Sequence, residues 1–223
     1  MQHDIQAADA ELLKRGEWFG SLPEALQSAI LERSRVRRVA RGDFLLREGE
    51  PGKGMYALLQ GRARHMRSVG ESDEVLMHVG EAGLWFGEYP LLTGKLTVGS
   101  VIADTAVRLL FLPALEFERL VDQEPRHLRH FARLLGERFA LLWRYVAEAT
   151  GLSPEEWLRT RLLGLVQVKK LNDDSSEAAT ITMSQTELAN MVGLSRQTLN
   201  LLLARLQSRG VIEVGYRKIR VLT

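Results

Sequence analysis

The chain has 223 residues, no cysteine, a net charge of +2 and a hydrophobic content of 45%. The absence of cysteine excludes disulfides, thiolate-bound iron–sulfur clusters and cysteine nucleophiles. No apolar run reaches the roughly 18 residues that a membrane-spanning helix needs. The polar N-terminus also lacks the basic-then-apolar order of a signal peptide. We therefore expect a globular protein of the cytoplasm that has no membrane partner.

The first half of the chain changes texture after its N-terminal segment. Residues 1–34 indicate helix or loop, followed by a helix from Pro23 to Arg33. From residue 36 to residue 112, short β-rich runs alternate with glycine-bearing turns, which predicts a β-sandwich or barrel. The runs are Phe44–Leu46, Met55–Leu59, Ala63–Met66, Val75–Val79, Val98–Ala103 and Arg108–Leu112.

A long helical stretch from Pro125 to Ala149 follows a short predicted helix at Glu116–Val121. Its apolar residues recur at steps of three and four, the spacing of a coiled-coil seam. They are Leu128, Phe131, Leu135, Phe139, Leu142, Val146 and Ala149. Such a stripe either pairs with a second copy of the chain or packs against its own β-domain. The length of the helix exceeds what that domain needs, which favours a homodimer.

The sequence Gly151-Leu152-Ser153-Pro154 ends the long helix, with Ser153 as a cap and Pro154 in the first turn of the next helix. That helix is predicted over Glu155–Lys170, followed by a polar loop over Asn172–Ala179. This break is a domain boundary and a candidate hinge. The resulting organisation is a β-rich domain at 1–124, a helix at 125–150 and a C-terminal domain at 151–223.

The stretch Ser184–Arg209 predicts two short amphipathic helices joined by a tight turn. Ser184 and Glu187 form a capping-box pattern, Gly193 can end the first helix, and Ser195 can cap the second. The buried stripe of the second helix would be Leu199, Leu202, Leu203 and Leu206. Two such helices are typical of a DNA-binding helix-turn-helix, although a helical hairpin within a core shows the same pattern.

The C-terminal segment adds two features to this pair of helices. Two short strands, Val211–Val214 and Lys218–Leu222, flank a turn at Gly215-Tyr216 and predict a small β-wing. Residues 181–223 carry six basic and two acidic residues, a net charge of +4, whereas the other 180 residues carry −2. A basic end on a neutral body suits a polyanionic partner such as DNA.

The order of these elements resembles the CRP/FNR family of bacterial transcription regulators, typified by the cyclic-AMP receptor protein and the fumarate–nitrate regulator. The resemblance rests on the segments Arg41–Ala63, Trp85–Glu88 and Met191–Ile212 and on the long helix between them. It implies an α+β fold with an N-terminal double-stranded β-roll, a dimerisation helix and a C-terminal winged helix-turn-helix. It further implies a homodimer on a pseudo-palindromic operator in double-stranded DNA, with RNA polymerase as a partner.

The second helix of the motif would present its polar N-terminal face to the major groove. With the leucines turned inward, Arg196, Gln197 and Asn200 face outward, and their side chains suit guanine and adenine edges. Residues that suit phosphate contacts or caps are Thr186, Ser195, Thr198, Arg205, Arg217 and Lys218. Relatives that read the best-known half-sites carry Glu in place of Gln197 and Arg in place of Leu201. We therefore do not expect this chain to recognise the operator sequence of those relatives.

The effector site that the resemblance implies is altered at both ends. In cyclic-AMP-binding relatives a Glu takes a ribose hydroxyl, an Arg and backbone amides hold the phosphate, and a Thr-Ser pair contacts the adenine. The corresponding positions are Gly87, Glu88, Tyr89, Thr97, Val98, Leu142 and Trp143. Only the Gly and the Glu match. We expect that cyclic AMP is not the effector, that the pocket suits another small molecule or none, and that Glu88 serves as a cap or anchor.

Other interpretations fit the residues less well. A cupin-type metalloenzyme would need a His-x-His cluster with a following Glu, which the sequence lacks. The five histidines form no clear metal set, although His127 and His130 share a helix face. No catalytic triad or phosphate loop is present, so we expect no enzyme. The remaining alternative is a ligand-sensing module that acts through protein contacts rather than through DNA.

Overall fold

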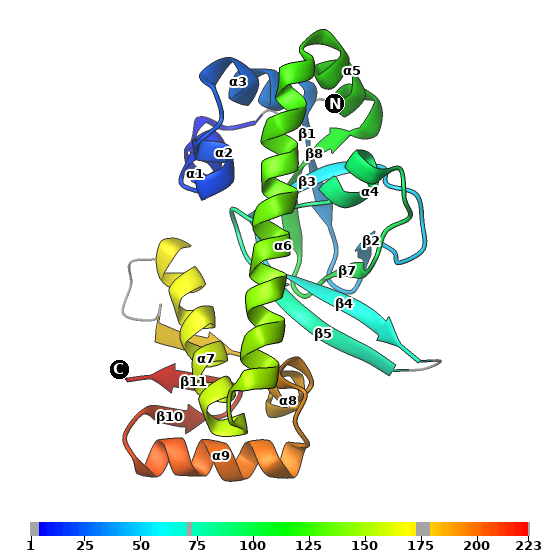
Figure 1. Ribbon diagram of the computed structural model, residues 1–223. Coiled ribbons are helices and arrows are strands. Elements are labelled where there is room, and N and C mark those ends of the chain that lie inside the picture. The colour runs from blue at the N-terminus through cyan, green and yellow to red at the C-terminus, as the bar shows by residue number, and fades with distance from the viewer. Residues whose placement is uncertain (1–4, 71–72, 173–178, 223) are drawn as a thin grey trace. The chain divides into compact units, whose positions relative to one another are not determined.

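The computed structural model describes residues 5–70, 73–172 and 179–222 (Figure 1). It divides into two compact units, Met1–Ala140 and Leu141–Thr223. The division falls inside the long helix α6 (Leu128–Gly151). The boundaries expected from the sequence, after residues 124 and 150, treat that helix as a separate part and remain a proposal. Each unit is described by itself below.

The first unit is built on two four-stranded antiparallel sheets. One sheet has the order β1 (Arg35–Val39), β8 (Val107–Pro113), β3 (Gly54–Gln60) and β6 (Trp85–Phe86). The other has the order β2 (Phe44–Leu46), β7 (Ser100–Ala103), β4 (Ala63–Val69) and β5 (Asp73–Gly80). Each of the six predicted β-rich runs overlaps a strand of these sheets, although Val98 and Gly99 precede β7. Strands β1 and β6 were not among the predicted runs. The predicted β-roll is confirmed.

Strand β3 lies between two cores. Met55, Ala57 and Leu59 pack with the helices that cover one face of its sheet. Tyr56 and Leu58 point the other way, into the core that the two sheets enclose. Because both faces of the strand are covered, its sequence is almost continuously apolar rather than alternating.

Helices cover the outer face of the first sheet. They are α1 (Ala7–Lys14), α2 (Glu17–Gly20), α3 (Glu24–Arg33), α5 (Ala114–Gln123) and the first part of α6, which follows a 3-10 turn at Pro125–His127. Phe131 of α6 is fully buried here, with its ring centroid 4.8 Å from that of Phe117 and 5.7 Å from that of Trp18. Its assignment to the exposed seam of α6 is therefore corrected: Phe131 belongs to the core of its own unit.

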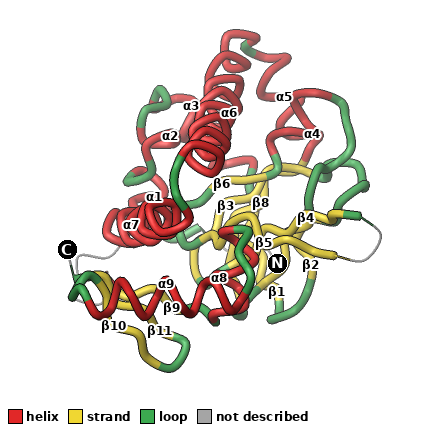
Figure 2. The backbone as a smooth tube through the Cα atoms, turned by 60° about the horizontal axis from the view of Figure 1, so that its bottom comes forward, coloured by secondary structure: helices red, strands yellow, loops and turns green. Residues whose placement is uncertain are grey.

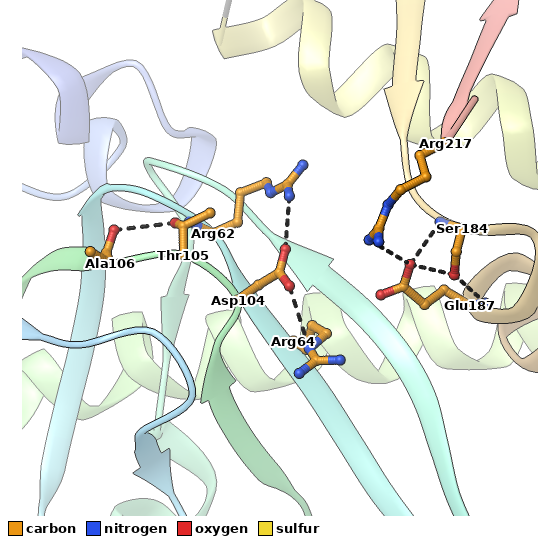
Figure 3. A network of polar contacts seen from close by, with 8 residues as sticks. All are labelled: Arg62, Arg64, Asp104, Thr105, Ala106, Ser184, Glu187 and Arg217. Atoms are coloured by element: carbon orange, nitrogen blue, oxygen red, sulfur yellow. Dashed lines mark hydrogen bonds and ion pairs between the residues drawn. The ribbon is translucent and has the colours of Figure 1, made fainter. Parts of the chain in front are cut away.

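Arginine–carboxylate pairs join the elements of this unit. Asp9 of α1 is 5% exposed and accepts hydrogen bonds from both terminal nitrogens of Arg108 on β8, one of them at 2.6 Å. Asp104, which follows β7, accepts a 2.8 Å hydrogen bond from Arg62 and lies 3.6 Å from Arg64 (Figure 3). These pairs satisfy charged groups between segments that are far apart in sequence.

The second unit contains three further helices and a small sheet (Figure 2). The helices are α7 (Pro154–Asn172), α8 (Gln185–Val192) and α9 (Arg196–Ser208). The antiparallel sheet has the order β10 (Ile212–Gly215), β11 (Lys218–Val221) and β9 (Thr180–Thr182). The predicted wing is thus present, with β9 as an unpredicted third strand. The predicted loop at Asn172–Ala179 lies, except at its ends, outside the described residues.

The ends of α8 and α9 follow the predicted capping chemistry. The Ser184 hydroxyl accepts a 3.1 Å hydrogen bond from the Glu187 amide, and the Glu187 carboxylate accepts one of 2.7 Å from the Ser184 amide. Gly193 ends α8 in the left-handed region at φ 67°, where a side chain would be strained. The Ser195 hydroxyl then accepts a 3.0 Å hydrogen bond from the Thr198 amide, which fixes the start of α9.

Two aromatic side chains bind the last carbonyls of α8. The Tyr145 hydroxyl, on the C-terminal part of α6, donates to the Met191 carbonyl at 2.6 Å. The Trp157 indole N–H, on α7, donates to the Val192 carbonyl at 3.1 Å. The two rings meet edge to face, with centroids 4.7 Å apart. The turn between α8 and α9 is therefore held by side chains from α6 and α7.

Candidate nucleic-acid interface and effector site

Helix α9 has one buried and one exposed face. Its leucine stripe is buried as predicted, and Arg196, Gln197 and Asn200 are exposed at its N-terminal end. Among the described residues, none of these three forms a hydrogen bond or an ion pair with another side chain or carbonyl. The fold therefore leaves one guanidinium and two carboxamides available for a partner.

A groove of about 360 Å³ lies between the start of α8 and the wing. Thr186, Arg196, Tyr216, Arg217 and Lys218 are among the residues that line it. Since the N-terminus of a helix carries a partial positive charge, the α8 end adds to the three cations. The groove thus brings together four of the nine residues that the sequence assigned to DNA contact, and its charge suits a phosphate.

The wing turn holds Arg217 in a fixed position. Arg217 has φ 54° and lies 3.8 Å from the Glu187 carboxylate, which also closes the capping box of α8 (Figure 3). The neighbouring Tyr216 is 92% exposed. The turn therefore directs Arg217 toward α8 and leaves Tyr216 projecting from the wing.

The remaining candidates for DNA contact lie along α9. Ser195 and Thr198 bond each other at its start, with their hydroxyl oxygens 2.8 Å apart, so Ser195 caps the helix and Thr198 holds the cap in place. Arg205 is exposed one turn before the end of the helix. Asn200 lines a second groove, of about 450 Å³, together with Gln185 and Gln207.

In the first unit, Glu88 stands at the start of helix α4 (Glu88–Thr93) and is 5% exposed. Its carboxylate lies 2.7 Å from Nε of Arg138 on α6, and the same guanidinium donates to the Trp85 carbonyl. The preceding Gly87 has φ 93°, and a Cβ atom there would come within 2.6 Å of the Gly54 carbonyl. Glycine is thus required at this position. Glu88 is anchored by an ion pair, and its partner, Arg138, was not predicted.

Neither residue aligned with the side chains that hold the phosphate in the family carries a positive charge. The Thr97 hydroxyl is 7% exposed and donates to the Glu50 carbonyl at 2.8 Å. Val98 is apolar, and its carbonyl accepts a hydrogen bond from Arg67. Tyr89 is half-buried on α4, and Lys95 is exposed. Thr97 and Val98 therefore supply no charge to a phosphate at this place.

A buried histidine adds no charge to the interior of the β-roll. His65 of β4 packs edge to face on Phe86, with centroids 5.5 Å apart. Burial, with His78 and Arg138 nearby, lowers the pKa of His65 to about 3. The ring is therefore neutral at neutral pH and cannot replace the missing arginine.

Helix α6 presents an apolar stripe to solvent. On it, Leu128, Phe139, Leu142 and Val146 are exposed, and Leu135 is half-buried. These five positions lie on one side of the helix, since the spacing from each to the next is close to a whole number of turns of 3.6 residues. Trp143 is 61% exposed beside them. Leu142 and Trp143 belong to the second unit, whereas Glu88, Thr97 and Val98 belong to the first.

Sequence reasoning missed two kinds of contributor. Arg138 lies 50 positions from Glu88, and no local pattern pairs them. Tyr145 and Trp157 act through single hydrogen bonds to backbone carbonyls, which leave no sequence signature. Within the described residues, no helix is long and apolar enough to cross a bilayer, and no group of three or more His, Asp or Glu could hold a metal ion.

Comparison with known proteins matches both units. Residues 36–124 match the family model of the cyclic nucleotide-binding domain, and residues 158–223 match that of the Crp-like helix-turn-helix domain. The CRP-like cAMP-activated global transcriptional regulator of Mycobacterium tuberculosis is 23% identical over 95% of this chain and 94% of its own. The transcriptional regulator SdrP of Thermus thermophilus is 26% identical over 81% of this chain and 86% of its own.

Solved structures agree with these matches. The structure of a CRP/FNR-family transcriptional regulator from Thermus thermophilus has a TM-score of 0.67 and 25% identity, covering 85% of this chain and 94% of that one. The c-di-GMP responsive global regulator CLP of Xanthomonas campestris shares the fold, with a TM-score of 0.72 and 19% identity, over 90% of this chain and 100% of that one. The chain belongs to the CRP/FNR family of transcription regulators, with a cyclic nucleotide-binding domain and a Crp-like helix-turn-helix domain.

Proposed function

We propose that this regulator reads a pseudo-palindromic operator in double-stranded DNA with the N-terminal face of α9. The observation that carries the proposal is that Arg196, Gln197 and Asn200 are exposed and have no partner among the described residues. Arg can donate two hydrogen bonds to guanine, and Gln or Asn can bond adenine in the same bidentate way. The protein acts by binding rather than by catalysis, in the cytoplasm.

Contacts to the DNA backbone surround this reading face. The groove lined by Thr186, Arg217 and Lys218 receives a phosphate, and Arg205 contacts the backbone on the other side of α9. Ser195 and Thr198 support the start of the helix and offer hydroxyls to the same strand. These contacts set the register of the protein on DNA without reading sequence.

The protein binds as a homodimer through residues 125–150. Leu128, Leu135, Phe139, Leu142 and Val146 form the seam, and their exposure in the single chain supports it. A two-fold dimer places two α9 helices on half-sites about 34 Å apart, which is one turn of DNA. RNA polymerase is the expected partner once the dimer is bound.

Cyclic AMP is not the effector. Neither Thr97 nor Val98 supplies a cation or a free hydroxyl for the phosphate. Proteins of this fold are described as cAMP-activated in one case and c-di-GMP responsive in another, so the fold does not determine the ligand. The domain responds to a different small molecule or acts without one.

Selection of bound sites from a random DNA pool, with and without cyclic AMP, tests both proposals. We expect one enriched pseudo-palindrome whose sequence and affinity are unchanged by cyclic AMP. Failure to enrich any sequence would overturn DNA reading. Enrichment only when cyclic AMP is present would leave DNA reading intact and overturn the effector proposal.

The dimer seam is tested with a matched pair of variants. Leu141 and Leu142 are both 51% exposed, but only Leu142 lies on the seam. Leu142→Arg should convert the protein to a monomer in sedimentation equilibrium, because two seams would bring like charges together. Leu141→Arg should stay dimeric. Equal behaviour of the two variants contradicts the seam.

A further inference from the structure

The middle of the exposed face of α9 is occupied by an apolar side chain. Successive residues of a helix are rotated by about 100°, so the positions directly opposite the leucine stripe are those of Gln197, Leu201, Ala204 and Ser208. Leu201 is 55% exposed. Arg196 and Asn200 instead each line a groove beside the helix.

We infer that Leu201 reads the 5-methyl group of a thymine in the major groove of the operator. The inference rests on the proposed function, since it requires that this face of α9 lies against base edges. Leu201 has no hydrogen-bonding group, so it cannot pair with the donors and acceptors of a base. The thymine methyl is the apolar group that base pairs present in the major groove, and apolar side chains recognise it by contact.

The neighbours of Leu201 support a thymine at this place. Gln197 lies one turn before Leu201 on the same face, and Asn200 is adjacent. Both carboxamides suit adenine, and an adenine on one strand places a thymine methyl on the other. A polar base edge against Leu201 would lose water without gaining a hydrogen bond, which disfavours the other bases.

Replacing thymidine by deoxyuridine in the selected operator tests the inference, because only the methyl group is removed. At one thymine in each half-site, we expect this change to weaken binding by about fourfold per half-site, which corresponds to about 0.8 kcal/mol. Leu201→Ala should bind the thymidine operator with a similar loss and should no longer distinguish thymidine from deoxyuridine. Leu163→Ala, which shortens a leucine that is 38% exposed on α7, should keep the full discrimination.

Two results overturn the inference while leaving the proposed function standing. One is an operator that the wild type binds specifically, with equal affinity after every thymidine has been replaced. The other is a Leu201→Ala variant that retains the wild-type response to deoxyuridine. A wild type that enriches no sequence at all is the separate failure of DNA reading.

Discussion

Within the β-roll unit, Arg62, Arg108 and Arg138 each hold a carboxylate, whereas Arg196 at the start of α9 forms no hydrogen bond or ion pair with a described residue. The first group joins strands and helices that are far apart in sequence. The second is fixed at its backbone by the Ser195 cap but free at its guanidinium. The paired arginines maintain the scaffold, whereas the guanidinium of Arg196 remains available to a partner such as DNA.

The largest effect is expected when the buried carboxylate partner of an arginine is removed. Asp9→Asn leaves the Arg108 guanidinium, whose side chain is 18% exposed, without its counter-charge. We expect a loss of about 3–5 kcal/mol in the free energy of unfolding, because an unpaired buried charge is costly. Urea unfolding followed by circular dichroism measures it. A loss below about 1 kcal/mol would show that the pair is dispensable.

The same carboxylate predicts a dependence on pH. Burial raises the pKa of Asp9, but hydrogen bonds from Arg108 and from the Gln6 amide outweigh it and leave the pKa lowered. The stabilisation is therefore present above the unfolded value of about 3.9 and is lost as the pH falls through the folded pKa. The difference in unfolding free energy between wild type and Asp9→Asn should shrink from pH 6 toward acid. A constant difference would contradict this.

Replacing Arg196, which is unpaired among the described residues, should instead weaken DNA binding and leave stability unchanged. Arg196→Ala should weaken specific operator binding by about 1–3 kcal/mol and relax one base position, with unfolding unchanged. Arg209→Ala is the control, because Arg209 is already paired with Glu155. Mobility-shift titrations and unfolding curves of both variants provide the test. Unchanged operator affinity of Arg196→Ala would reject its role in reading.

The effect of the capping box on stability should be intermediate. The box belongs to the fold, but Ser184 also lines the groove between α8 and the wing. Ser184→Ala removes the acceptor for the Glu187 amide and should cost about 1 kcal/mol of stability. Ser208→Ala removes a hydroxyl that donates to the Arg205 carbonyl at the C-terminal end of α9, and it should change stability by less than about 0.5 kcal/mol. Thermal unfolding of the two variants should separate them, and equal midpoints would argue against the cap.

A substitution in the wing should also have little effect on stability. Arg217→Gly relieves the left-handed backbone but adds freedom to the unfolded chain, so the net change should stay below about 0.5 kcal/mol. Its effect should appear in DNA binding instead. The slope of log K against log salt for non-specific DNA should fall by about 1. Fluorescence anisotropy over a salt series measures this, and an unchanged slope would remove Arg217 from the phosphate contacts.

The sequence predicted most elements because their signals are local. Glycine-bearing turns marked the β-roll, and the leucine spacing of α9 identified both its buried face and its exposed face. Strand β1 was missed because three of its five residues are arginines and only Val36 is buried. Strand β9 was missed because it has three residues and pairs with β11, which lies far along the chain.

Partners across the fold were harder to predict than elements. Spacing at three and four residues placed Phe131 on an apolar stripe, but it cannot tell whether a residue near the edge of the stripe faces its own core or a second copy. Likewise, Glu88 was expected to be an anchor, yet its partner Arg138 comes from another element. These assignments depend on tertiary contacts that no window of sequence contains.

The single-sided burial of α9 has a consequence for how such regulators diversify. Leu199, Leu202, Leu203 and Leu206 tie the helix to its unit, so substitutions on the opposite face leave its attachment intact. A library that varies Arg196, Gln197, Asn200 and Leu201 should therefore consist mainly of folded proteins that differ in the promoters they recognise. We expect that exchanging these four side chains on an unchanged scaffold would give regulators for new sets of genes or for engineered circuits.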